Sequence, residues 1–238
     1  MVFDLDDIDI ETLVDLDTAR DDTEEDLVGS DLHQDAITEA HAGIAAYARE
    51  QGLPWYVSKQ VMVIAPAPGR TDWRPSPDVY VALDVPTGPR SSYNAFAEPF
   101  PLFVIEVMSG TSVNRDLTIK RTMYRVAGAQ EYLIFDPTGE WLEERQVQAW
   151  RLPTAEADQP IPEWEEWEPD ATGTWHSDVL GLGFRVEGML LRAVRPDGSP
   201  LPTRQELARR VVELEEELGI LPRRVAELEE ENRRLRGE

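Results

Sequence analysis

Two apolar runs on either side of an amphipathic segment constrain the fold of this chain more than any other feature. Residues 102–108 and 131–135 are mostly apolar, as buried strands are, and the segment 112–127 repeats its apolar side chains at helical spacing. A strand, a helix and a strand of these lengths form a right-handed crossover, which places the two strands parallel. The chain is therefore predicted to have an α/β fold.

The run 102–108 carries a single charged residue, Glu106. An ionised carboxylate inside a fold costs about 3 kcal/mol or more unless a cation or hydrogen bonds offset it. We therefore expect a positive group beside Glu106. Alternation along a strand gives Glu106 the same face as Val104 and Met108, and gives Phe103 and Ile105 the other face.

The rest of the chain up to residue 195 fits the same α/β plan. A helix is predicted over 31–51 and further strands over 55–64, 78–85, 146–152, 173–175 and 184–186, with a loop over 90–100. The short strands after residue 140 are interpreted as a β extension of one domain that spans 27–195.

Residue usage limits the chemistry that the chain can perform. It has no cysteine and three scattered histidines, which exclude disulfides, thiolate metal sites and a histidine-rich zinc site. Any metal should be a hard, oxygen-bound ion such as Mg²⁺ or Mn²⁺. An acidic N-terminus without an apolar leader, and the lack of any long apolar window, predict a cytoplasmic protein without membrane contact.

The formal charge of −24 is distributed unevenly. Residues 1–31 hold thirteen acids and one base, whereas residues 59–151 hold eleven acids and ten bases. A segment as acidic as 1–26 is typical of a solvated tail, and an alternative is a mimic of nucleic-acid charge. The predicted core is close to neutral, and its bases Arg115, Lys120, Arg121 and Arg125 leave room for a local DNA-facing patch.

Three further positions accompany Glu106. Asp78 opens the predicted strand 78–85, and Asp116 and Lys120 lie one helical turn apart. Taken singly, an acid before a strand is usually turn chemistry, and an acid and a lysine four residues apart usually form a surface pair. Together, two acids and a lysine suggest a divalent-metal site for phosphodiester chemistry, in which Asp78 and Glu106 hold the metal and Lys120 assists the attacking water.

An ordered series of short motifs carries a family resemblance. It consists of Pro77-Asp78, the run 103–109, Asp116, Lys120, Tyr124, Gly128 and the run 131–137, with Leu32-His33-Gln34 before the first helix. Over about residues 27 to 152 the series resembles the putative restriction endonuclease family of the PD-(D/E)XK nuclease superfamily. The resemblance implies a restriction-endonuclease-like fold, with a mixed central sheet flanked by helices. It also implies DNA as substrate, Mg²⁺ or Mn²⁺ as cofactor, and Asp78 and Glu106 as metal ligands.

The chain departs from the superfamily pattern at one position. The lysine of that pattern lies two residues beyond the acid, where this chain has Met108. The resemblance suggests that Lys120 has taken over from the following helix. His33, Asp116 and Tyr124 are candidate accessory residues, although a lone histidine at a helix start also fits a structural role.

The segment 203–236 has coiled-coil patterning. Apolar residues follow alternating steps of four and three over four repeats, and Asn232 shares a sub-position with Val211. A polar residue there can fix the register and the number of helices. Gly219 and Pro222 are expected to interrupt the helix, which leaves a hairpin on the chain's own domain as the alternative to a homodimer.

Three functions remain open from the sequence. The first is a divalent-metal-dependent DNA endonuclease that acts as a coiled-coil dimer. The second is a catalytically silent nuclease-fold scaffold or binding protein that dimerises through the same segment. The third is an acidic mimic of DNA, which gives no reason for Glu106 inside an apolar strand.

Overall fold

The computed structural model describes residues 31–67, 70–109, 115–142, 145–153 and 161–236. The chain divides into two compact units, Met1–Leu201 and Pro202–Glu238. The acidic segment 1–26 lies outside the described residues, so both interpretations of it stay predictions.

A six-stranded sheet forms the centre of the first unit. In spatial order its strands are β1 (Trp55–Ser58), β4 (Val79–Leu83), β6 (Phe103–Val107), β7 (Glu131–Phe135), β8 (Val147–Arg151) and β9 (Glu165–Glu166). Strands β6 and β7 pair in parallel, and the other neighbours pair antiparallel. The predicted mixed sheet and its parallel crossover are confirmed.

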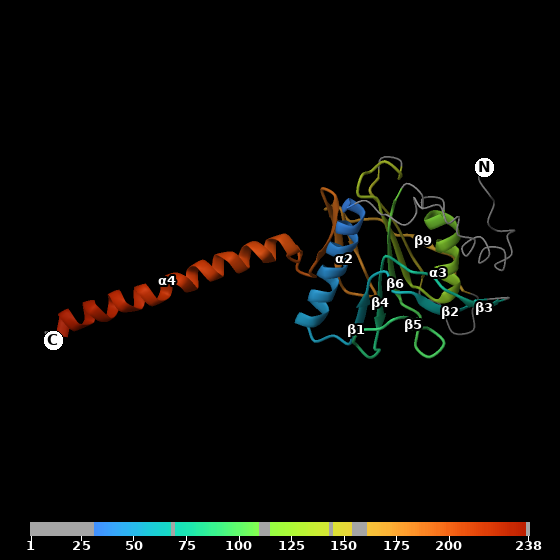
Figure 1. Ribbon diagram of the computed structural model, residues 1–238. Coiled ribbons are helices and arrows are strands. Elements are labelled where there is room, and N and C mark those ends of the chain that lie inside the picture. The colour runs from blue at the N-terminus through green and yellow to red at the C-terminus, as the bar shows by residue number, and fades with distance from the viewer. Residues whose placement is uncertain (1–30, 68–69, 110–114, 143–144, 154–160, 237–238) are drawn as a thin grey trace. The chain divides into compact units, whose positions relative to one another are not determined.

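Helices lie on both faces of this sheet (Figure 1). Helix α2 (Asp31–Glu50) belongs to the apolar cluster that includes Phe103 and Ile105, and the opposite face holds Val104 and Met108 below helix α3 (Arg121–Ala127). The second face also carries a group of buried aromatic rings, Trp73, Tyr80, Tyr93, Tyr124 and Tyr132. Glu106 was predicted to share the face of Val104 and Met108, and the structure shows that this face carries the aromatic rings.

Two three-stranded sheets complete the first unit. One has the order β3 (Arg70–Trp73), β2 (Val63–Ala67), β5 (Tyr93–Asn94), and the other has the order β10 (Thr174–His176), β11 (Gly183–Glu187), β12 (Leu190–Val194). The strands predicted after residue 140 therefore divide between two sheets. Strand β8 joins the main sheet, whereas β10 and β11 belong to the small sheet, whose strand β12 packs against α2.

The single strand predicted over 55–64 is wrong. The chain turns between β1 and β2 at Gln60, whose φ of 53° lies in the left-handed region. The backbone N–H of Gln60 bonds the carbonyl oxygen of Pro77 at 3.0 Å, which holds the turn beside the start of β4. Strand β2 then leaves the main sheet and pairs with β5, which lies in the predicted loop 90–100.

The helix predicted over 112–127 has two parts. Residues 112–114 lie outside the described stretches, Arg115–Lys120 forms a π-helical turn (η3), and α3 follows without a gap. Such wide turns are rare and frequently occur at functional sites. Gly128 ends α3 with a φ of 104°, and its N–H bonds the carbonyl oxygens of Tyr124 and Arg125.

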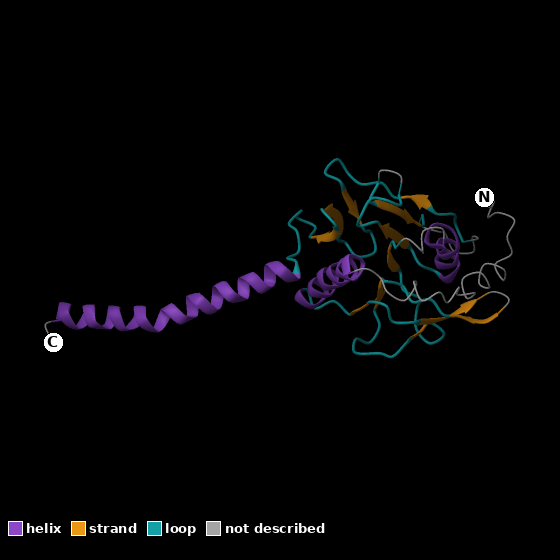
Figure 2. Ribbon diagram, turned by 45° about the horizontal axis from the view of Figure 1, so that its top comes forward, coloured by secondary structure: helices purple, strands orange, loops and turns teal. Residues whose placement is uncertain are grey.

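The second unit contains one helix, α4 (Arg204–Arg236), which continues through Gly219 and Pro222 (Figures 1 and 2). The predicted interruption, and with it the hairpin, is wrong. A proline removes one N–H from the helix, so the carbonyl oxygen of Leu218 loses its usual partner. Leu218 is exposed, and water can bond that oxygen.

A capping box starts α4. The N–H of Thr203 donates to Glu206 Oε2 at 2.8 Å, and the N–H of Glu206 donates to Thr203 Oγ1 at 3.1 Å. Among the helices of the described residues, none has the length and apolar content that a membrane crossing requires.

Candidate functional site

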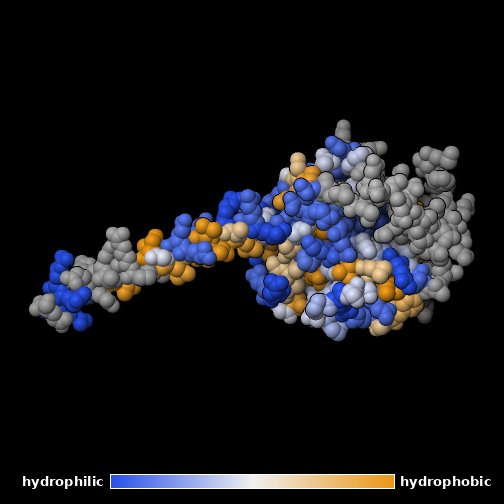
Figure 3. Space-filling view, viewed as in Figure 1, coloured by the Kyte–Doolittle hydropathy of each residue, from blue (hydrophilic) through white to orange (hydrophobic). Residues whose placement is uncertain are grey.

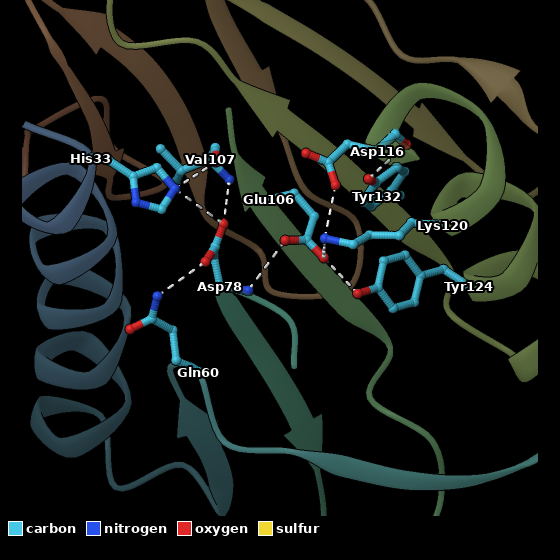
Figure 4. A network of polar contacts seen from close by, with 9 residues as sticks. All are labelled: His33, Gln60, Asp78, Glu106, Val107, Asp116, Lys120, Tyr124 and Tyr132. Atoms are coloured by element: carbon cyan, nitrogen blue, oxygen red, sulfur yellow. Dashed lines mark hydrogen bonds and ion pairs between the residues drawn. The ribbon is translucent and has the colours of Figure 1, made fainter. Parts of the chain in front are cut away.

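Glu106 lies near the end of β6 and is 1% exposed. Its Oε1 atom accepts a hydrogen bond from the Tyr124 hydroxyl at 2.5 Å and lies 3.2 Å from Lys120 Nζ. Its Oε2 atom faces Asp78, whose backbone N–H donates to it at 3.4 Å (Figure 4). The positive group expected beside Glu106 is therefore Lys120.

Lys120 closes η3 and reaches back toward the sheet. Its Nζ atom lies 2.8 Å from Asp116 Oδ1, so one ammonium group bridges Asp116 and Glu106. The Asp116 side chain is 1% exposed, which makes this a buried pair rather than the surface pair that its spacing usually indicates. The backbone oxygen of Asp116 also accepts a hydrogen bond from the Tyr132 hydroxyl at 3.0 Å.

Asp78 directly precedes β4, where its side chain meets the end of β6. Its Oδ2 atom accepts a hydrogen bond from the N–H of Val107 at 2.9 Å, and its Oδ1 atom accepts one from Gln60 Nε2 at 3.3 Å. The side chain is 13% exposed, so this carboxylate reaches the surface where Glu106 does not. Strand β4 pairs with β6, and this pairing brings the two acids together.

His33 lies in the first turn of α2, on the other side of Asp78. Its Nε2 atom is 2.8 Å from the carbonyl oxygen of Val107 and 3.8 Å from Asp78 Oδ2. Figure 4 shows the order His33, Asp78, Glu106, Lys120 across the sheet. All six residues selected from the sequence, namely His33, Asp78, Glu106, Asp116, Lys120 and Tyr124, thus lie in one polar network.

Burial and neighbouring charges act in opposite directions within the network. Burial raises the pKa of the Glu106 carboxyl well above its usual value; the charge of Lys120 opposes this, and the charges of Asp78 and Asp116 reinforce it. Burial alone would lower the pKa of Lys120, but the charges of Glu106, Asp116 and Asp78 raise it above its usual value. Lys120 is therefore a permanent cation at neutral pH.

A family of known proteins matches most of the chain. Residues 24–187 match the family Uma2, described as "Putative restriction endonuclease". The chain belongs to this family. A crystal structure described as a putative nuclease belonging to DUF820, from Anabaena variabilis ATCC 29413, is similar to it, with a TM-score of 0.46 and 17% identity over 65% of this chain and 76% of that chain. No curated protein matches the chain.

Membership of the Uma2 family places the chain among nuclease-like proteins, and the match covers all six network residues that were selected from the sequence. Met108, two residues beyond Glu106, is 3% exposed and packs in the aromatic-face cluster. A lysine at that position would lie within the apolar cluster. In this chain the ammonium group instead reaches Glu106 from η3.

Two members of the network were missed from the sequence. Gln60 carries no signal of its own, because only the turn between β1 and β2 brings it to Asp78. Tyr132 lies in an apolar strand, where its pattern indicates a core residue, although its hydroxyl bonds the backbone of Asp116. Burial, with the charges of Asp116, Glu106 and Asp78, raises the pKa of Tyr132 and keeps its hydroxyl protonated.

Two of the bases near the network, Arg121 and Arg125, contact side chains outside it. The guanidinium group of Arg121 lies over the ring of Trp150 at 5.0 Å, and Arg125 pairs with Glu163. The side chain of Arg115 lies outside the described part. Among the bases expected there, Lys120 alone is directed at the acids in the part of the chain that the structure describes.

Proposed function

We propose that the protein is a divalent-metal-dependent DNA endonuclease. One observation carries the proposal: two acids from paired strands, Asp78 and Glu106, are in contact, and the cation Lys120 approaches the second of them from a helix. Such a constellation suits hydrolysis of a phosphodiester, in which a water oxygen bonds to phosphorus and one P–O ester bond breaks. Family membership supports the same reaction class.

The residues fit a hard metal ion such as Mg²⁺ or Mn²⁺. Asp78 and Glu106 offer carboxylate oxygens, and Lys120 and Tyr124 occupy Oε1 of Glu106, so Oε2 and the Asp78 carboxylate would hold the ion. Within the described residues no three acids or histidines form a metal-holding group. Mg²⁺ suits a site with two protein ligands, because it usually keeps several waters and binds substrate phosphate.

The ion would lower the pKa of a bound water and offset charge in the transition state. Lys120 remains protonated, because the surrounding acids raise its pKa. It therefore cannot take a proton from the water, and its role is to orient the water and to stabilise the developing negative charge. Tyr124 and Asp116 act as positioning residues that hold Glu106 and Lys120 in place.

His33 contacts both the carbonyl of Val107 and the side of Asp78 that faces α2. We assign it an accessory role in holding Asp78 against the end of β6. The proposal also includes a cytoplasmic location and self-association through residues 203–236. A dimer would allow two sites to address the two strands of DNA.

A metal titration tests the proposal first. Calorimetry of the purified full chain with Mg²⁺ and then Mn²⁺ should give saturable binding, and the double variant Asp78→Asn/Glu106→Gln should give none. Glu131→Gln is the matched control, because it removes a buried carboxylate from the neighbouring strand outside the network. The same proteins are then assayed for conversion of supercoiled plasmid to nicked or linear DNA, with EDTA as the metal-free reference.

One observation favours the alternative, a catalytically silent scaffold with a nuclease fold. Lys120 already offsets the charge of Glu106 without any metal. If the wild-type protein binds neither Mg²⁺ nor Mn²⁺ in the titration, the endonuclease proposal is wrong and the scaffold takes its place. Its biology would then depend on residues 203–236 and would be unaffected by Glu106→Gln.

A further inference from the structure

More than half of the large apolar side chains that are exposed in the described residues lie along one seam of α4. Its described apolar members, Leu207, Val211, Leu214, Leu218, Val225, Leu228 and Leu235, are each between 40% and 80% exposed. Figure 3 shows apolar side chains among the polar ones along this helix. A continuous helix of this length carries the seam unbroken, so a partner helix can cover all of it.

We propose that two copies of α4 pair as a parallel, in-register, two-stranded coiled coil. The proposal rests on the self-association proposed above, and adds the direction, the register and the number of helices. It is carried by three features of α4 from Val211 onward: the core residue types, the polar core residue Asn232, and the charges that flank the core.

The core residue types favour two strands. Val211, Leu218, Val225 and Asn232 share one core position, and the second core position is leucine throughout, at residues 207, 214, 221, 228 and 235. Parallel dimers prefer a β-branched residue at the first position with leucine at the second; Val211 and Val225 match this preference, and Leu218 does not. Leucine at the first position and isoleucine at the second would favour larger bundles.

The polar core residue favours the parallel direction. In a parallel in-register pair, Asn232 of one helix meets Asn232 of the other, and the two amides bond each other. In the antiparallel pair with the greatest overlap, Asn232 lies against Leu207 of the other helix and finds no polar partner across the seam. In the single chain its Nδ2 atom donates to the carbonyl oxygen of Leu228 at 3.1 Å. A buried amide without a partner costs about 1–3 kcal/mol, so the seam selects the arrangement that pairs it.

The flanking charges are complementary in the same arrangement. Two flanking positions meet across a parallel pair. The residue just before a first core position, such as Arg210 before Val211, lies beside the residue five positions later in the other helix, which directly follows a second core position. The sequence gives four such pairs from Arg210 onward. Three join opposite charges, namely Arg210 with Glu215, Arg224 with Glu229 and Glu231 with Arg236, and the fourth joins Glu217 to the uncharged Pro222. Every contact between two charged residues is attractive, and none is repulsive.

Within one helix Arg210 already pairs with Glu213 at 3.0 Å. That contact lies away from the seam, so Arg210 can exchange Glu213 for Glu215 of the second helix. The parallel direction has one consequence for the assembly. In each chain α4 begins directly after the first unit, so both chains enter a parallel coil at the same end.

The first experiment measures self-association of the full chain by sedimentation equilibrium. The wild type is expected to be a dimer, and Val211→Glu a monomer. Val212→Glu is the matched control, because Val211 and Val212 are 54% and 53% exposed but only Val211 lies in the seam. A monomeric wild type would overturn both self-association and the proposal. A trimer, or a dimer that survives Val211→Glu, would overturn the proposal alone.

The second experiment measures the direction. The chain has no cysteine, so Leu207→Cys and Leu235→Cys introduce single thiols near the two ends of α4. The two variants are mixed in a glutathione redox buffer and allowed to reach equilibrium. Disulfides between two copies of the same variant are expected. Disulfides that join the Leu207→Cys variant to the Leu235→Cys variant would show an antiparallel pair and overturn the proposal while leaving self-association intact.

The third experiment tests the register through charge. Arg210→Glu places two glutamates together twice in each dimer and should weaken dimerisation by about tenfold. The double variant Arg210→Glu/Glu215→Arg should restore it. Arg209→Glu makes the same change of charge one residue earlier, outside the seam, and should leave dimerisation unchanged. Equal effects of Arg209→Glu and Arg210→Glu would overturn the proposed register.

Discussion

Glu106 and Glu131 are buried carboxylates on neighbouring parallel strands, and their surroundings differ in kind. The register pairs Phe103 with Glu131 and Glu106 with Ile134, so the two acids lie toward opposite ends of the strands. Glu131 accepts hydrogen bonds from the Ser177 hydroxyl and from the N–H groups of Asp178 and Val179. Its donors are neutral groups of one loop.

Glu106 instead lies among charged groups from other elements. The charged side chains that act on it are Lys120, Asp78 and Asp116, and the hydroxyl of Tyr124 donates a hydrogen bond to it. Burial raises the pKa of both carboxyls. The difference separates a structural acid from a candidate catalytic one: Glu131 anchors a loop, whereas Glu106 lies in a cluster of charged side chains from different elements.

The largest expected difference between the two acids is in DNA cleavage. Glu106→Gln removes a proposed metal ligand and should lower the cleavage rate at saturating Mg²⁺ by about 10³-fold or more. Glu131→Gln should leave the rate within about twofold of the wild type, because the described hydrogen bonds of the Glu131 side chain go to residues 177–179 and not to the network. Plasmid cleavage rates at equal protein concentration measure both. Equal losses of cleavage rate in Glu106→Gln and Glu131→Gln would contradict the assignment of a catalytic role to Glu106 and a structural role to Glu131.

Removal of the cation should destabilise the Glu106 region strongly. Lys120→Met leaves Glu106 and Asp116 buried without a positive partner, and should lower the free energy of unfolding by about 3 kcal/mol. Lys59→Met is the control, since Lys59 bonds only the Thr38 hydroxyl at 2.9 Å among the contacts described. Urea unfolding measures the change. Mg²⁺ should restore part of the stability of Lys120→Met, and an absence of rescue would contradict a metal position at the two acids.

Removal of the loop anchor should have a moderate effect on stability and none on cleavage. Glu131→Ala leaves the buried Ser177 hydroxyl and the Asp178 N–H without their acceptor, at a cost of about 2 kcal/mol. Glu165→Ala removes an exposed acid and should change stability by less than about 0.5 kcal/mol. Thermal unfolding in EDTA separates the two. A Glu131→Ala protein as stable as Glu165→Ala would show that water replaces the carboxylate.

The smallest expected effect is a pH dependence at Glu106. Its pKa in the folded protein is raised above the ordinary 4.5, so its protonated form adds stability below that pH, and this stability is lost as the pH rises through the folded pKa. Glutamine does not titrate. In EDTA the melting temperature of Glu106→Gln, relative to that of the wild type at the same pH, should therefore increase as the pH rises. If this melting-temperature difference decreases as the pH rises, the charge of Lys120 affects the pKa of Glu106 more than burial does.

The sequence predicts well those features that depend on pattern along the chain. The alternation in 102–108 assigned Glu106 to the face of Val104 and Met108, and the crossover predicted the parallel pair of β6 and β7. The approach of Lys120 to Glu106 was implied by the family resemblance and not by spacing. The burial of the Glu106 carboxylate predicted that a cation lies beside it, but did not predict which residue provides that cation.

Features that depend on tertiary contacts were not predictable. The turn at Gln60 is held by backbone bonds to Pro77 and Asp78, which lie seventeen or more residues away. Residues 112–127 have a helical pattern, but the pattern does not distinguish a π turn from an α turn at Arg115–Lys120. Pro222 is a strong local signal for a break, yet α4 passes through it at the loss of one hydrogen bond.

Each of the two acids is held by the main chain of the strand that carries the other. The N–H of Asp78 donates to Glu106, and the N–H of Val107 donates to Asp78. A slip of one residue between β4 and β6 would break both contacts and turn Glu106 to the other face. Correct strand pairing and assembly of the site are therefore one event. A copy of the protein that has not completed this pairing has no site, and under the proposed function it is harmless to DNA until it has folded.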